Sequence, residues 1–156
     1  MTEPANNLDE IDRKILGILA QDPRTPYADV AEQLAEAGHE MSTEGVRYRV
    51  SNLFETTSVL LTTDPTEYGW EVLRVLVSLA GDADHKAETF DRLTRMEFWM
   101  VCRVMGSFDL YAVATVPSNR EADDLVGRVR GLDHVAGVEY TIETGRETTT
   151  ANYLAF

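Results

Sequence analysis

The chain holds very little lysine and almost no cysteine. Lys14 and Lys86 are its only lysines, and arginine supplies the other twelve of its 14 basic side chains. Against these stand 27 acidic residues, which give a net charge of −13 that is spread over both halves of the sequence. Such an acidic surface repels nucleic acid at low salt. Molar salt shortens electrostatic screening to about 3 Å and removes most of the self-repulsion, so we expect the source organism to be a halophile.

The scarcity of cysteine and of long apolar runs excludes several further classes of protein. Cys102 has no second cysteine with which to form an internal disulfide or a multi-thiolate metal site. It lies in an apolar run, so we expect a buried structural thiol. No stretch approaches the roughly 20 apolar residues of a membrane helix, and residues 1–4 lack the positive charge that begins a signal peptide. We therefore expect a cytoplasmic protein that does not enter membranes.

No group of residues typical of catalysis or metal binding stands out. His39, His85 and His134 are far apart in the sequence, and the chain has no glycine-rich phosphate loop. The sequence therefore predicts no catalytic residues, no metal site and no cofactor. With 156 residues, of which 44% are hydrophobic, two small cores suit the chain better than one.

The pattern of the N-terminal part predicts three helices. Asp9 is suited to cap the first, Thr25-Pro26 to begin the second and Ser42 to cap the third, while Gly38 is a natural stop for the second. Apolar residues recur at three- and four-residue spacing in each segment, as a single buried helix face requires. They are Leu8, Ile11, Ile15, Ile18 and Leu19; then Tyr27, Val30, Ala31 and Leu34; then Val46, Val50 and Leu53.

The second and third of these helices form the pattern of a helix-turn-helix, whose second helix enters the major groove of DNA. We expect the DNA-binding side chains on and beside its outward face: Thr43, Glu44, Arg47, Tyr48, Arg49 and Ser51. Arg47 is the best candidate to read a base, because arginine forms bidentate hydrogen bonds with guanine. Arg49 lies at the edge of the buried stripe, where it either borders the domain interior or touches phosphate. A merely solvated helix face is the alternative for both arginines.

The second half alternates strand and helix patterns. Apolar, β-branched runs predict strands at 72–79, 98–105, 110–116 and 135–143, and helical spacing predicts helices at 83–96 and 119–132. This is the order of the ferredoxin-like βαββαβ fold, an α+β arrangement with two helices on one face of a four-stranded antiparallel sheet. Its other face is bare, so we expect a homodimer formed through the sheet, with higher homo-oligomers open. We expect the apolar tail at 151–156 to dock on that assembly.

A short loop, Gly106-Ser107-Phe108-Asp109, joins the two central strands. From the residues alone it is a glycine-assisted hairpin in which Asp109 bonds its own backbone, or else a loop that binds a ligand.

Several segments, in their order along the chain, resemble the Lrp/AsnC family of transcription regulators. They are residues 8–16, 27–31, 42–47 and 64–65, Gly69, the 106–109 loop and residues 147–149. The resemblance implies a winged helix-turn-helix DNA-binding domain over 1–64 and a ferredoxin-like effector-binding and oligomerisation domain over 65–156. Its implied partners are double-stranded DNA and a small effector, an amino acid. Together with the acidity, it indicates a halophilic archaeon as the source.

The resemblance also implies where the effector binds. In the family the equivalent loop lines an effector site between subunits, and a strand opposite supplies polar contacts. The matching residues here are Gly106, Ser107, Phe108 and Asp109 in the loop and Thr141 and Glu143 on the strand. Phe108 has no hydroxyl group, which removes one possible hydrogen bond to a ligand carboxylate.

The chain departs from the family in two places. It has an insertion within residues 35–41, and its wing is shortened between residues 59 and 64, where 60–63 hold no basic side chain. Two alternatives to an effector-controlled regulator are therefore kept. One is an enzyme of the same two-domain plan that resembles siroheme decarboxylases, for which His134 and Arg103 are the candidate residues. The other is a ligand-binding or assembly module that no longer reads DNA.

Overall fold

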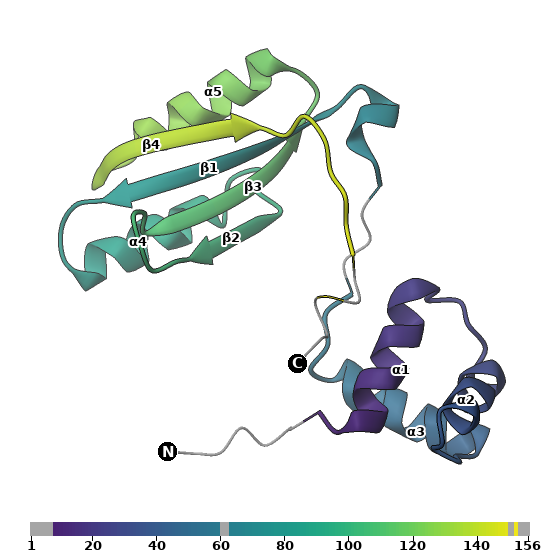
Figure 1. Ribbon diagram of the computed structural model, residues 1–156. Helices are drawn as coiled ribbons and strands as arrows, with labels where there is room; N and C mark the ends of the chain where they lie inside the picture. The colour runs from purple at the N-terminus through teal and green to yellow at the C-terminus, as the bar shows by residue number, and fades with distance from the viewer. Residues whose placement is uncertain (1–7, 60–62, 150–151, 153–156) are drawn as a thin grey trace. The chain divides into compact units, whose positions relative to one another are not determined.

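The computed structural model describes residues 8–59, 63–149 and 152. The chain divides into two compact units: Met1–Leu61 together with Glu147–Phe156, and Thr62–Arg146. Figure 1 shows the three helices of the first unit and the sheet with two long helices of the second. None of the helices in the described part is both long and apolar enough to cross a membrane.

The first unit contains helices α1 (Glu10–Gln21), α2 (Tyr27–Glu36) and α3 (Thr43–Phe54). Asp9 caps α1 as predicted: its carboxylate accepts the backbone N–H of Asp12 at 2.8 Å, and the Asp12 carboxylate accepts that of Asp9 in return. The three predicted apolar stripes meet in one core. Its buried members are Ile15, Leu19, Val30, Leu34, Val46, Val50 and Leu53, and burial stabilises each by about 1.5–3 kcal/mol.

The turn between α2 and α3 lies where the sequence predicts an insertion. Gly38 ends the helix as predicted, with a φ of +87° that favours glycine. The N–H of Gly38 donates to Ala35 and that of His39 to Leu34, which is the Schellman closure of a helix end. The prediction for the start of α2 was wrong by one residue. Pro26 occupies the cap position and Thr25 donates its hydroxyl to the carbonyl of Asp22, because the preceding Asp22 turn already holds the threonine.

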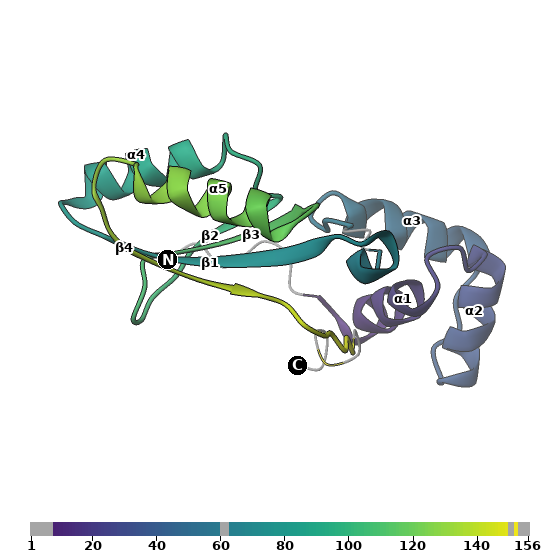
Figure 2. The same cartoon turned by 90° about the horizontal axis from the view of Figure 1, so that it is seen from above.

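The second unit is a ferredoxin-like βαββαβ domain. After the short 3-10 helix η1 (Pro65–Tyr68) come β1 (Glu71–Leu79), α4 (Ala83–Leu93), β2 (Met100–Arg103), β3 (Leu110–Val116), α5 (Asn119–Arg130) and β4 (Val135–Ile142). The antiparallel sheet has the strand order β2-β3-β1-β4. Figure 2 shows both α4 and α5 on one face of it. The predicted fold is therefore confirmed.

The core of this unit lies between the sheet and its two helices. Leu73, Val75 and Val77 of β1 face the helices and are fully buried. Side chains alternate along a strand, so Arg74 and Leu76 lie on the opposite, open face. Four predicted elements are shorter than expected: α4 ends at Leu93 rather than at 96, α5 at Arg130 rather than at 132, β4 at Ile142 rather than at 143, and β2 spans Met100–Arg103 rather than 98–105. Cys102, expected to be buried, is half-buried because β2 is an edge strand.

The predicted wing falls on residues 59–64, of which 60–62 lie outside the described residues. The described residues on either side, Val59 and 63–64, belong to no strand. The tail at 151–156 also lies outside the described part of the chain, apart from Asn152.

Candidate functional site

The N-terminus of α3 is the first candidate site. Ser42 caps it as predicted, because its hydroxyl accepts the N–H of Gly45 at 3.1 Å. A Cβ atom at Gly45 would lie 2.9 Å from Cγ of Met41, so the turn before α3 packs directly against the first turn of that helix. The helix that carries the predicted reading residues therefore begins at a fixed position.

The predicted reading residues lie on the exposed side of α3, except for Arg49. Thr43, Glu44, Arg47, Tyr48 and Ser51 are all exposed. The side chain of Arg47 is 61% exposed and lies 3.7 Å from the Glu44 carboxylate one helical turn away. Tyr48 is 69% exposed and packs on no neighbour that would bury it. This face can therefore approach a partner without any rearrangement of the core.

Arg49 instead holds α3 to α1. Its Nη1 lies 2.6 Å from Oδ2 of Asp9 and 2.7 Å from Oδ1 of Asp12, the two residues of the α1 capping box. The side chain is only 29% exposed. The backbone N–H of Asp12, followed by the Arg49 guanidinium, holds the pKa of Asp9 below its usual range, and both carboxylates raise the pKa of Arg49. Sequence reasoning placed Arg49 at the edge of the interior but could not name partners so distant in the sequence.

Other basic side chains of the first unit also form ion pairs or hydrogen bonds. Residues 8–59 hold ten acidic and five basic side chains. Within this described stretch Lys14 lies 3.8 Å from Glu10, Arg24 lies 3.3 Å from Asp22, and Arg13 donates to the Leu8 carbonyl. Since Arg49 is also paired, only Arg47 combines a basic group with a place on the exposed reading face.

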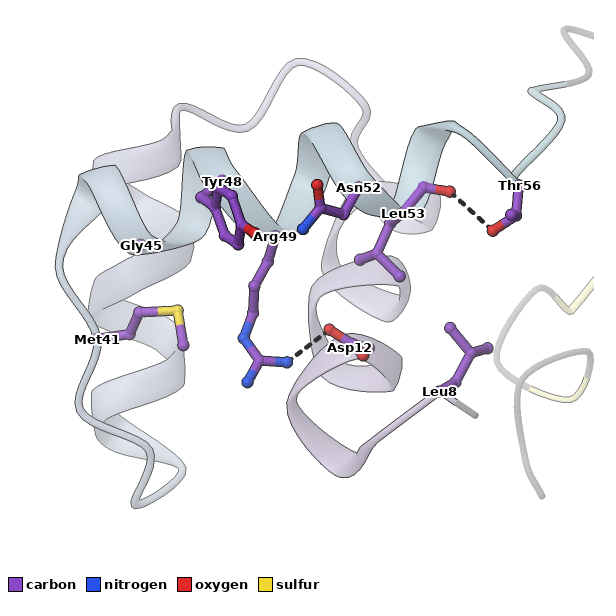
Figure 3. Close-up of a pocket in the computed structure, with 9 residues that line it drawn as sticks. All are labelled: Leu8, Asp12, Met41, Gly45, Tyr48, Arg49, Asn52, Leu53 and Thr56. Atoms are coloured by element: carbon purple, nitrogen blue, oxygen red, sulfur yellow. Dashed lines mark hydrogen bonds and ion pairs between the residues drawn. The ribbon is translucent and has the colours of Figure 1, made fainter. Parts of the chain in front are cut away.

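A groove of about 450 Å³ runs beside this face, between α3 and the start of α1. It is lined by Leu8, Asp12, Met41, Gly45, Tyr48, Arg49, Asn52, Leu53 and Thr56. Figure 3 shows Arg49 crossing the groove to Asp12, with Met41 toward one end and Leu8 toward the other. The pattern of the sequence did not predict this groove, because its walls come from three separate segments.

The loop at Gly106–Asp109 is the second candidate site. Gly106 has a φ of +140°, which favours glycine. Asp109 is fixed on three sides: Oδ1 lies 2.5 Å from Nζ of Lys86, Oδ2 accepts the N–H of Leu79 at 2.8 Å, and its own N–H donates to Val77. These hydrogen bonds, that of Lys86 first, lower the pKa of Asp109. Asp109 thus bonds the neighbouring strand and α4, rather than its own backbone as the hairpin alternative supposed.

The remaining loop residues differ in exposure. Ser107 and Gly106 are exposed and Phe108 is half-buried. Both oxygens of Asp109 have partners within the domain, so Asp109 positions the loop. Ser107 is the exposed polar side chain of the loop.

Thr141 and Glu143 lie at the other end of the sheet. Thr141 pairs with Arg74, and the N–H of Glu143 donates to Val72 at the start of β1, whereas the loop adjoins Leu79 at its end. Along β1, seven residue steps separate Val72 from Leu79 and five separate Arg74 from Leu79, distances of roughly 23 Å and 17 Å. One copy of the domain therefore does not bring the two halves of the predicted effector site together.

Glu143 takes part in a network on the open face of the sheet. Its carboxylate accepts hydrogen bonds from Arg74, with Nε at 3.0 Å, and from Nε of Arg146 at 2.7 Å, while Arg74 also donates to the hydroxyl of Tyr111. Burial raises the pKa of Glu143, but the two arginines outweigh it and the pKa is lowered. Sequence reasoning missed Arg74 and Tyr111, although their alternation with apolar residues on adjacent strands is a signal for an open-face pair.

Comparison with known proteins shows what this two-unit chain resembles. Residues 8–53, which include all three helices, match the AsnC-type helix-turn-helix domain. The regulatory protein AsnC of Haemophilus influenzae is 29% identical over 144 residues, which cover 88% of this chain and 91% of that protein. The chain therefore carries an AsnC-type helix-turn-helix domain and is similar over most of its length to a regulator of the Lrp/AsnC family. These similarities are those of a DNA-binding transcription regulator.

Solved structures agree on the fold of this regulator. AsnC of E. coli superposes with a TM-score of 0.71 at 20% identity, covering 92% of this chain and 97% of that one. The transcriptional regulator NMB0573 of Neisseria meningitidis, solved as a complex with L-Met, superposes with a TM-score of 0.73 at 16% identity, covering 95% and 99% of the two chains.

Proposed function

We propose that α3 reads operator DNA through its exposed face, with Arg47 as the base-reading side chain. The observation that supports this proposal is the difference in exposure and contacts between two neighbouring arginines. Arg47 is exposed on the reading face, while Arg49 is committed to Asp9 and Asp12. Thr43, Glu44, Tyr48 and Ser51 surround Arg47 and contact bases or backbone, and Arg49 contributes by fixing the position of α3.

Selection from random double-stranded DNA tests this reading. The unmodified protein enriches a sequence with two related half-sites, because a symmetric dimer presents two copies of α3. Arg47→Ala relaxes the preference at one base pair of each half-site. Failure of the unmodified protein to enrich any sequence would instead favour a module that no longer reads DNA.

A homodimer through the open face of the sheet is the second part of the proposal. Along with Arg74 this face carries half-buried Leu76, Met100 and Tyr111, more apolar surface than a solvated sheet face needs. Function then divides between residues 1–64, which read DNA, and residues 65–156, which assemble and bind the effector.

The effector in this proposal is an amino acid bound between two copies of the second domain. The loop at 106–109 of one subunit faces Thr141 and Glu143 of its partner, which accounts for their places at opposite ends of a single sheet. The L-Met complex of the Neisseria relative supports the ligand class. Backbone groups of the loop, Ser107 and Thr141 provide polar contacts, and Phe108 provides an apolar wall.

Mixed dimers test the placement between subunits. An Asp109→Ala chain and a Thr141→Val chain each form homodimers with both sites damaged. A heterodimer of the two has one intact site if the site is shared, and no intact site if it lies within one chain. Calorimetric titration with the twenty amino acids, starting with L-methionine, therefore finds restored binding at one site per mixed dimer. No restored binding would place the effector elsewhere.

We propose, finally, that the protein acts in a salt-rich cytoplasm, as its net charge of −13 suggests. Its melting temperature then rises between about 0.1 M and 2 M KCl, because salt screens the repulsion among its carboxylates. Equal melting temperatures would remove the basis for a halophilic source.

A further inference from the structure

The first turn of α3 carries an acidic side chain on the face proposed to read DNA. Glu44 is the one acidic residue in the sequence of α3, and its side chain is 82% exposed. The phosphates of DNA repel a carboxylate. An acid at this place therefore lowers the affinity for every DNA sequence, except where it gains a specific contact.

Glu44 pairs with the arginine proposed to read a base. Its Oε2 lies 3.7 Å from Nε of Arg47, one helical turn further along α3. Among the described residues this is the only ion pair of Arg47, so its terminal nitrogens, Nη1 and Nη2, are free for the two acceptors of guanine, O6 and N7. The other carboxylate oxygen of Glu44, Oε1, has no hydrogen-bond partner within the described part of the chain. Each side chain therefore keeps a free end beside the other.

The start of α3 is fixed, which gives Glu44 a defined position. The Ser42 hydroxyl caps the helix by accepting the N–H of Gly45, and Met41 packs against that glycine. Arg49 ties the same helix to α1. In a helix-turn-helix, the N-terminal residues of the second helix contact the edges of the bases. Glu44 is the second residue of this helix and belongs to that group.

We propose that Glu44 determines the operator sequence by accepting a hydrogen bond from the N4 amino group of a cytosine, in the base pair next to the guanine that Arg47 reads. This inference rests on the proposed reading of DNA by α3. Cytosine presents a donor in the major groove, whereas guanine and thymine present acceptors that a carboxylate repels. A neighbouring pair fits because the 3.7 Å between the two side chains is close to the spacing of stacked bases, roughly 3.4 Å.

The two side chains then act together in discrimination. On a matching sequence, the bond to cytosine offsets the repulsion between Glu44 and the phosphates. On any other sequence the carboxylate has no donor and binding is weakened, which separates the operator from its competitors. A chain with a net charge of −13 thus gains specificity by weakening the wrong complexes, and not by adding basic contacts.

Selection from random double-stranded DNA with the full chain, followed by affinity measurements at one fixed salt concentration, tests the role of Glu44. The unmodified protein enriches a guanine with an adjacent cytosine in each half-site. Glu44→Ala keeps the guanine and loses the cytosine, so discrimination at that position falls at least about fivefold. Glu44→Gln selects adenine in place of cytosine, because glutamine forms bidentate hydrogen bonds with N6 and N7 of adenine.

Glu55→Gln is the matched control. Glu55 is an exposed acidic residue at the opposite end of α3, so its substitution removes the same charge and leaves the N-terminal turn intact. We expect it to raise the affinity for all sequences alike and to keep the cytosine preference. Unchanged melting curves establish that each variant is folded.

The possible results are distinguishable. An unchanged cytosine preference in Glu44→Ala overturns the inference, and so does an equal gain on all sequences for Glu44→Ala and Glu55→Gln. A loss confined to the guanine position also overturns it, because Glu44 would then only orient Arg47. If the unmodified protein enriches no sequence, the proposed reading of DNA fails as well. A guanine that depends on Arg47, without a cytosine that depends on Glu44, overturns this inference alone.

Discussion

Lys86 on α4 holds Asp109, the residue before β3, with Nζ 2.5 Å from Oδ1. The other carboxylate oxygen accepts the N–H of Leu79, the last residue of β1. One aspartate thus ties the loop at Gly106–Asp109 to a helix and to the neighbouring strand. The loop is positioned by the domain before any ligand arrives.

Removal of the Asp109 carboxylate loosens this loop. Asp109→Ala leaves the Leu79 N–H without its acceptor and is expected to lower the free energy of unfolding by about 1–3 kcal/mol. We expect a weaker response to the effector and unchanged DNA affinity without it, because Asp109 lies in a different unit from Arg47. Lys86→Met is the matched control, since it removes the charge but keeps the bond to Leu79. Unaltered stability and effector response in Asp109→Ala would show that the loop needs no such anchor.

The same contact predicts a dependence of stability on pH. Lys86 first, and then the N–H of Leu79, lower the pKa of Asp109 below its usual 3.8. Because the folded pKa lies below the unfolded one, the carboxylate stabilises the fold above about pH 4 and loses this contribution as the pH falls through the folded value. Denaturation of the unmodified protein and of Asp109→Asn between pH 6 and about pH 2 is expected to show a stability difference that shrinks in acid. A constant difference would contradict this.

Substitutions of the two arginines of α3 are expected to have different effects, one on DNA binding and the other on stability. Arg47→Ala weakens specific DNA binding by about 1–3 kcal/mol and leaves the melting temperature unchanged, because its side chain is exposed. Arg49→Ala lowers the stability of the first unit by about 1 kcal/mol, since it removes the link from α3 to α1. Binding assays at one fixed salt concentration and thermal melts distinguish them. Equal loss on all DNA sequences for Arg47→Ala would make it a phosphate contact.

Local sequence patterns predicted those features of the fold that depend on neighbouring residues. The caps at Asp9 and Ser42, the stop at Gly38 and the strand at 110–116 follow from local rules, because each depends on residues within one turn or strand. The partners of Arg49 lie 37 and 40 positions away, so they depend on how α1 and α3 pack.

Strand register was the other missing information. The sequence predicted both the loop at 106–109 and the fourth strand, but it did not show that Thr141 and Glu143 fall at the far end of β1 from that loop. Register depends on the turns and on which face each strand buries, and a shift of one residue reverses every side chain. The six predicted effector residues therefore stay a prediction that requires a second subunit.

The pairing of cations in the first unit predicts a weak salt dependence of DNA binding. Affinity normally falls with salt because phosphate contacts release counterions, with a slope of about −0.9 for each contact. Arg47 is the exposed basic side chain of the reading face and is assigned to a base, so we expect a slope no steeper than about −2 for a dimer in a plot of log affinity against log salt concentration. Fluorescence anisotropy over a range of KCl measures it. A slope steeper than about −5 would mean that the paired arginines and lysines are released to bind phosphate.

The central claim is that an effector on the second domain controls DNA reading by the first. Its most direct test is the coupling between the two ligands, measured at one salt concentration with the selected DNA sequence and the amino acid that binds in calorimetry. We expect the effector to change DNA affinity by about 5- to 150-fold, and DNA to change effector affinity by the same factor, because the coupling free energy is shared. If both ligands bind and neither alters the affinity of the other, the two units act independently and the proposed mechanism is wrong.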